Sequence, residues 1–185
     1  MKKSFVEYVI FTFTYLILLA SFPIEISSAQ AQILDLDLLS QQTIWQPFAA
    51  AVVTQNRTSL GIYVITNYTG DLFNRAYLPI SVNSSDNKPI ILALKYASAS
   101  YFGNATFFAE IRDNRTNDVL WSDSLNNTNG QMRDQIFVLP VSVLNKPVEF
   151  RFYIITNGIG EHSLIFNKVN LSFYNVTQRV TVETS

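Results

Sequence analysis

The chain has 185 residues and a formal net charge of −1, and only 15% of its residues are charged. Nucleic acids and acidic lipid surfaces are not expected partners, because binding to either needs a basic patch and the Lys and Arg residues here are scattered. The chain has no cysteine, which excludes a disulfide scaffold, thiol chemistry and cysteine-based metal sites.

The N-terminus has the pattern of a secretory signal peptide. Lys2 and Lys3 form a positive region, and an uninterrupted apolar stretch follows from Tyr8 to Ala20. The small residues Ala29 and Ala31 then supply the two positions that a signal peptidase reads. The pattern predicts a signal peptide at 1–31, and the remaining residues, 32–185, as one domain.

Two alternatives for the N-terminus stay open. The apolar stretch is short for a membrane span, which needs about 20 residues, but it could remain uncleaved as a membrane anchor. Lys3 and Ser4, placed before an apolar helix with an early Glu7, also resemble a type IV prepilin leader. Pro23 would end such a helix soon after the apolar stretch.

The segment Gln32–Leu39 has the pattern of an amphipathic strand. Its leucines Leu34, Leu36 and Leu38 alternate with aspartates. It is the first strand of the chain's own sheet or a donor strand that completes the sheet of a neighbouring subunit. Both arrangements bury the same leucines.

Alternation with a period of two runs through the rest of the chain and predicts half-buried antiparallel strands. The clearest segments are Ile90–Tyr96, Phe107–Arg112, Val148–Ile155 and Ile165–Phe173. Further candidates are Leu60–Thr66, Tyr77–Val82, Val119–Ser122 and Gln135–Leu139. In the last of the clearest segments we expect Ile165, Val169 and Leu171 on the buried side and Phe166 on the other.

Turn signals separate these segments, as at Thr69–Asp71, Asn83–Asn87, Asn126–Gly130 and Asn157–Gly160. About nine to ten short strands divided by such turns predict an all-β fold, an antiparallel β-sandwich of the jelly-roll type. No internal repeat is present.

From about Tyr77 to Phe173 the succession of strands resembles galactose-binding-like and carbohydrate-binding-module jelly rolls. These families often close with an apolar–Asp–Asn/Asp–Val–x–apolar string, and the matching positions here are Phe166–Leu171 (FNKVNL). Asn167 stands where the Asp is expected, so the resemblance does not extend to a calcium or ligand contact there. It implies the fold, and this fold serves sugar-binding, lipid-binding, protein-binding and structural roles.

Eight Asn-x-Ser/Thr sequons follow the N-terminal segment, where chance would give roughly three. They are at Asn56, Asn67, Asn83, Asn104, Asn114, Asn126, Asn170 and Asn175. A sequon is used only outside the cytoplasmic membrane, so we expect a secreted or cell-surface glycoprotein. Dense sequons without cysteine favour an archaeal surface protein.

Catalytic motifs are weak. His162 is the only histidine, so no histidine cluster can bind zinc, and Ser163 beside it does not make a triad. Asp35 and Asp37 share one strand face, whereas a glycosidase needs two carboxylates facing a cleft. We therefore predict no catalytic residues and no enzyme.

No cofactor is expected. Asp113, Asp118 and Asp123 could supply oxygens to a structural calcium ion, but no motif supports such a site, and turn-forming Asp is the simpler interpretation.

Aromatic side chains are the candidate ligand contacts. Trp45, Trp121 and Tyr101, the last with Phe102 beside it, could stack on a sugar ring. Most of the chain's aromatic residues must be core, and Trp121 fits that interpretation as well.

Three functions stay open. The first is binding of carbohydrate or another surface polymer. The second is a structural subunit of an extracellular filament or coat, assembled through residues 32–39. The third is a membrane-anchored surface protein with an uncleaved N-terminal helix.

Overall fold

The computed structural model describes residues 35–39, 44–84 and 88–173. The predicted signal peptide, Leu34 and Asn175 lie outside the described residues. Within the described part the strands are β1 (Asp35–Asp37), β2 (Gln46–Phe48), β3 (Ala51–Asn56), β4 (Ser59–Thr66), β5 (Asp71–Ser81), β6 (Ile90–Asp113), β7 (Val119–Leu125), β8 (Arg133–Leu139) and β9 (Pro147–Phe173). A single turn of 3₁₀ helix, η1 (Val141–Val143), precedes β9.

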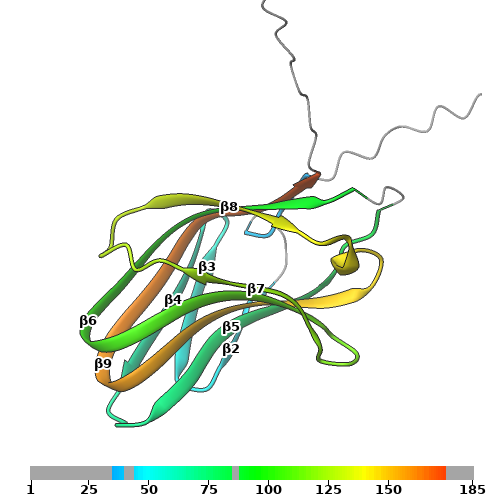
Figure 1. Ribbon diagram of the computed structural model, residues 1–185. Helices are drawn as coiled ribbons and strands as arrows, with labels where there is room; N and C mark the ends of the chain where they lie inside the picture. The colour runs from blue at the N-terminus through cyan, green and yellow to red at the C-terminus, as the bar shows by residue number, and fades with distance from the viewer. Residues whose placement is uncertain (1–34, 40–43, 85–87, 174–185) are drawn as a thin grey trace, which may run out of the picture. The chain divides into compact units, whose positions relative to one another are not determined.

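The two long strands β6 and β9 pair antiparallel along almost their whole length and run through both layers of the molecule. The C-terminal half of β6 and the N-terminal half of β9 form a first sheet in the order β2-β5-β9-β6-β7. The other halves form a second sheet in the order β3-β4-β9-β6-β8, with β1 at the end of β9. Figure 1 shows both long strands turning back at the left of the view. The predicted antiparallel all-β sandwich is confirmed.

Glycine makes the bend between the layers possible. Gly103 has φ of 69°, and a Cβ there would lie 2.4 Å from the carbonyl oxygen of Ile159. A Cβ on Gly160 would lie 2.1 Å from the carbonyl oxygen of Phe102. Neither position has room for a side chain, so the two backbones can cross from one sheet to the other only with glycine there.

Aromatic rings from both layers meet in the core. The ring of Phe152, in the first sheet, lies 4.1 Å from the ring of Phe166, in the second. Trp45 stacks on Phe152 at 5.1 Å, and Tyr96 approaches Phe166 at 6.0 Å. The alternation predicted for β6 around Phe107 and for the N-terminal half of β9 is confirmed, because their inward residues are buried.

The predicted register of the last segment is wrong at its start. Phe166 is 0% exposed and belongs to the core, whereas Ile165 is only half-buried on the outer side. The register with β6 shifts between Lys95 and Tyr96 and leaves Asn167 as an extra residue on β9. This β-bulge changes which residues face inward, so the expected alternation holds only beyond it.

The described part of the N-terminal amphipathic segment pairs within its own chain. Leu36 of β1 lies opposite Leu171 of β9 and packs against the core. Leu38 is fully buried, and its backbone N–H donates to the carbonyl of Val169 at 2.8 Å. β1 therefore extends the second sheet of the same chain here, and exchange of this strand between subunits stays a prediction. Of the residues that the structure describes, none belongs to a helix long and apolar enough to span a membrane.

Candidate functional site

The strand register aligns the outward side chains of the first sheet in rows. One row, read from β2 to β7, contains Phe48, Arg75, Tyr153, Phe108 and Ser124. The next row contains Gln46, Tyr77, Arg151, Glu110 and Ser122. On the other side of the first row lie Phe73, Ile155 and Thr106. These three rows, with Arg112 and Glu149 in the row beyond Glu110 and Arg151, are here called the first-sheet face.

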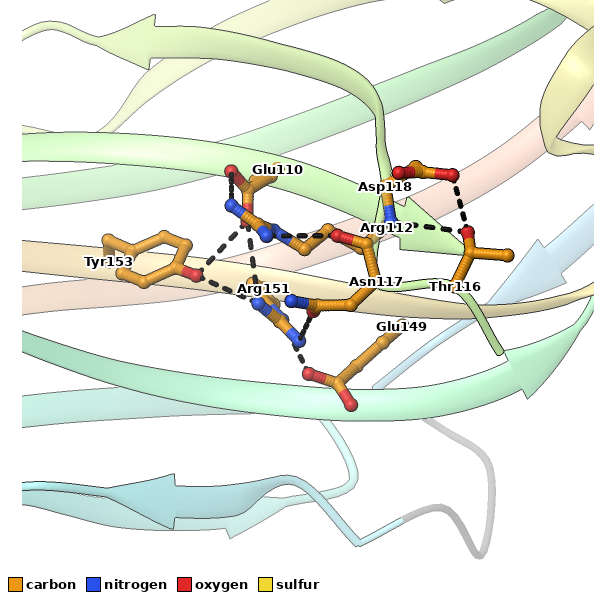
Figure 2. Close-up of polar contacts among 8 residues, drawn as sticks. All are labelled: Glu110, Arg112, Thr116, Asn117, Asp118, Glu149, Arg151 and Tyr153. Carbon is orange, nitrogen blue, oxygen red and sulfur yellow. Dashed lines mark hydrogen bonds and ion pairs between the residues drawn. The ribbon is translucent and has the colours of Figure 1, made fainter. Parts of the chain in front are cut away.

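Ion pairs link outward side chains of this face, and they are here called its floor. Figure 2 shows their contacts. The guanidinium of Arg112 holds Glu110 with two bonds, Nε to Oε1 at 2.6 Å and Nη2 to Oε2 at 3.2 Å. Both residues project from β6, two positions apart, and therefore point to the same side of the sheet. Such a bidentate pair fixes both side chains in one orientation.

Arg151 of β9 is the centre of the network (Figure 2). Its Nε donates to Glu149 at 2.5 Å, its Nη1 to the Tyr153 hydroxyl at 3.3 Å and its Nη2 to Oδ1 of Asn117 at 3.1 Å. The Tyr153 hydroxyl in turn donates to Oε1 of Glu110 at 3.0 Å. Arg151, Glu149 and Tyr153 are all buried, and each of them has polar partners within the network.

Both guanidinium groups stay charged in this environment. The hydrogen bond to Glu110 raises the pKa of Arg112. Burial lowers the pKa of Arg151, but its hydrogen bonds with Tyr153 and Glu149 outweigh that effect, and the pKa is raised. The network therefore holds two positive charges in fixed positions.

The loop between β6 and β7 closes one end of the face. Asn117, with φ of 62°, also accepts a bond from Arg112 Nη1 through its carbonyl oxygen at 3.0 Å. Asp113 accepts the backbone N–H of Arg115 at 2.9 Å, and this bond is the main reason why the pKa of Asp113 is lowered. The loop thus holds the ion-pair network in place.

The three aspartates that could supply oxygens to a calcium ion make local hydrogen bonds. The Thr116 hydroxyl donates to Oδ2 of Asp118 at 2.6 Å, and Asp123 accepts the backbone N–H of Ser124 at 2.7 Å. Within residues 35–39, 44–84 and 88–173, no three His, Cys, Asp or Glu side chains gather in a way that could hold a metal ion.

A hollow of about 270 Å³ opens on the first-sheet face. Its lining combines apolar rings with charged and hydroxyl groups, namely Phe73, Phe108, Tyr153, Ile155, Glu110, Arg112 and Ser122. Phe73 is 57% exposed, so its ring is available to a ligand. Flat rings beside fixed donors and acceptors can hold a molecule with apolar faces and a polar rim.

The structure places the three sequence-predicted aromatic candidates apart from this hollow. Trp45 is 2% exposed, and its Nε1 donates to the carbonyl of Leu38 inside the core. Trp121 is half-buried and packs edge-on against Phe137 at 5.0 Å. Tyr101 is exposed and lines a separate hollow of about 190 Å³ on the second sheet.

Sequence reasoning missed the rings of the first-sheet face, above all Phe73 and Phe108. The available signal was the content of the outward positions. Glu149, Arg151 and Tyr153 alternate along one strand and share its outer side. A carboxylate, a guanidinium and a phenol in one row can bind a ligand, which was the signal for a site there.

His162 has a different serine partner from the one beside it in sequence. Its Nδ1 lies 2.8 Å from Oγ of Ser100, which comes from β6, and Ser163 points to the opposite side of β9. His162 is 2% exposed, its buried Nε2 has no hydrogen-bond partner, and burial lowers its pKa. The Ser100 hydroxyl also donates to the carbonyl oxygen of Gly103 at 3.1 Å.

Six of the seven described sequon asparagines are exposed; these are Asn56, Asn67, Asn83, Asn104, Asn114 and Asn126. Asn170 is half-buried on the outer side of the second sheet. None of the seven belongs to the rows of the first-sheet face. Asn104 lies one row beyond them, opposite Asn157 at the bend.

Solved structures share this fold. A CBM4 structure matches with a TM-score of 0.50 at 15% identity, covering 70% of this chain and 86% of that one. The xylan-binding module CBM15 matches with a TM-score of 0.52 at 8% identity, covering 77% of this chain and 98% of the module. The agarase AgWH50C matches with a TM-score of 0.54 at 13% identity, and the match covers 76% of this chain but only 25% of the agarase.

No protein-family model and no curated protein matches the chain. At identities this low the structural matches establish the fold alone. They confirm the predicted resemblance, because the chain has the β-jelly-roll fold of carbohydrate-binding modules.

Proposed function

We propose that the protein is a non-catalytic, N-glycosylated carbohydrate-binding protein of the cell exterior, and that it holds a saccharide on the first-sheet face. The observation that carries this proposal is the hollow lined by Phe73, Phe108 and Tyr153 over a floor of ion pairs. A pyranose has apolar C–H faces that stack on such rings, and its hydroxyls take hydrogen bonds from fixed charged groups.

The floor favours binding over catalysis. Glu110 bonds with Arg112 and Tyr153, and Glu149 bonds with Arg151. A glycosidase needs one carboxyl group that delivers a proton and a second that attacks or activates water, and both must face the substrate. Carboxylates committed to guanidinium groups are poor at either task, whereas they orient the donors that hold a ligand.

The exposed sequons support an extracellular location. Asn114 and Asn126 are exposed in loops and lie outside the rows of the first-sheet face. A glycan on Asn104 would border the face, so binding should be measured on native material and on an Asn104→Gln variant. Glycopeptide mass spectrometry of native protein that finds every sequon unmodified would remove the argument for this location.

Binding of the full-length chain to a panel of soluble polysaccharides tests the proposal. Phe73→Ala removes an exposed ring of the hollow and should weaken binding by about tenfold, since aromatic contacts contribute about 0.5–1.5 kcal/mol beyond the area that they bury. Tyr101→Ala is the matched control, because it removes a ring of similar exposure from the other sheet. Binding that survives the Phe73 change and is lost with the Tyr101 change would place the site elsewhere.

A further inference from the structure

One arginine of the first-sheet face stands outside the ion-pair network. Arg75 of β5 lies between Phe48 and Tyr153 in the register. Its guanidinium carbon is 4.0 Å from the ring centre of Phe48, 5.6 Å from that of Tyr77 and 5.8 Å from that of Tyr153. Aromatic rings thus hold this cation in place by cation–π attraction.

Arg75 forms no ion pair with any residue that the structure describes. In the described part of the chain no carboxylate lies within ion-pair distance of it, and its buried Nε has no hydrogen-bond partner. Arg112 is paired with Glu110 and Arg151 with Glu149, so Arg75 is the surplus charge among them. The nearest carboxylate further along β5, Asp71, accepts a bond from Asn157 at 2.6 Å.

A guanidinium without a carboxylate partner favours a ligand that supplies acceptors, because an unsatisfied donor costs free energy. Rings around the guanidinium lower its hydration and preorganise its planar fork, which matches the two oxygens of a carboxylate. Phe73 and Tyr153 are neighbours of Arg75 along and across the strands, and both line the hollow. A sugar ring stacked in the hollow can therefore bring a ring substituent to Arg75.

We propose that Arg75 is the anion-recognising residue of the first-sheet face and that the saccharide bound there carries carboxylate groups, as a polymer of uronic acid does. This inference rests on the proposed saccharide site. The neutral rings of the hollow hold the sugar faces, and Arg75 selects the acidic sugar over its neutral counterpart.

Titration calorimetry on the full-length chain tests the inference with short homopolymers of galacturonate, glucuronate and mannuronate. Each is paired with its fully methyl-esterified form, which removes the charge and adds one methyl group to each sugar. We expect at least one acid to bind more tightly than its ester by about 10- to 100-fold, the range for hydrogen bonds to charged groups, and to bind more weakly as salt increases. Arg75→Gln should abolish that preference, and Arg75→Lys should restore part of it.

Arg57→Gln is the matched control, because Arg57 is an exposed cation at the turn between β3 and β4 of the other sheet. Melting temperatures of all variants separate loss of recognition from loss of fold. Binding of acids and esters with equal affinity would overturn the inference and leave the proposed function standing. Arg75-dependent binding of dextran sulfate alone would overturn the carboxylate assignment. Binding of no saccharide, neutral or acidic, would overturn both proposals.

Discussion

The two outer faces of the sandwich are built largely from the same two strands, β6 and β9, yet they differ in chemistry. On the first sheet the outward positions of these strands hold Glu110, Arg112, Glu149, Arg151 and Tyr153. On the second sheet the outward positions of the same strands hold mostly small or apolar residues such as Ala97, Ala99 and Ile165, together with the exposed Lys95 and Lys168.

The inward positions explain why the fold tolerates this difference. Both halves of each strand fill the core with the same kind of residue, so burial of apolar area stabilises both sheets alike. Packing of the core therefore does not determine which residues occupy the outward positions. Moving Glu149 and Arg151 out of water costs free energy that their pairing at best offsets, so folding alone gives no reason to place them there. The difference is one of the reasons for proposing a binding role for the first-sheet face.

The largest effect is expected when the network itself is broken. Arg151→Ala leaves Glu149 buried without its cation and removes a partner from Tyr153 and Asn117. Removing one partner of a buried ion pair costs about 3–5 kcal/mol, and chemical denaturation would measure that loss. Lys95→Ala, on the outer side of the second sheet, should change stability by less than about 0.5 kcal/mol. Equal losses in the two variants would show that the two faces do not differ energetically.

The sandwich could be predicted from sequence because the alternation of buried residues is local. The buried sides of the strands around Phe107 and Phe150 were predicted correctly, and so was the antiparallel class of the fold. What the local pattern could not show is that Ile90–Tyr96 and Phe107–Arg112 belong to one bent strand. That continuity depends on how closely the backbones cross at Gly103 and Gly160, which is a contact between residues far apart in sequence.

The candidate site was harder to predict for the same reason. Phe48, Arg75 and Phe108 come from three strands and meet only through register. Attention to rare residue types favoured Trp45 instead, whose ring fills the core. A bulge of one residue at Asn167 was enough to reverse the expected sides of its neighbours, so register errors of this kind limit any site drawn from alternation alone.

The bend that the two faces share should be sensitive to acid. Burial lowers the pKa of His162, so the folded state binds a proton less readily than the unfolded state, whose histidine has a pKa of about 6.5. Stability should therefore fall as the pH drops below about 6.5, by at most about 1.4 kcal/mol per pH unit for one proton.

Denaturation curves at several pH values, compared with a His162→Gln variant, would measure the histidine's share of this pH dependence. NMR gives a second measurement that does not depend on a variant, because the chain has a single histidine whose ring signals can be titrated directly. A ring that titrates at or above 6.5 would contradict the expectation.

A smaller loss of stability is expected when the bond between the β6–β7 loop and the ion-pair network is removed. Asn117→Gly keeps a residue that tolerates positive φ and removes only the bond from Arg151 to Oδ1, so we expect a loss of about 1 kcal/mol. Asn129→Gly is the matched control, since Asn129 has φ of 51° and its side chain makes no hydrogen bond with the described residues, only its backbone N–H donating to Asn127. If both variants lose the same stability, the amide of Asn117 contributes nothing to the first-sheet face.

The smallest effect concerns glycan on the second face. Asn170 lies between Asp37 and Ala93 in the register and is half-buried, whereas Asn114 and Asn126 are exposed in loops. A transferase reaches an exposed loop asparagine more easily than one set in a sheet, so we expect lower occupancy at Asn170 than at either loop site. Glycopeptide mass spectrometry of native protein gives the three occupancies from one digest. Full occupancy at Asn170 would mean that a glycan covers the outer face of the second sheet. The two faces would then differ because one carries a glycan and the first-sheet face does not.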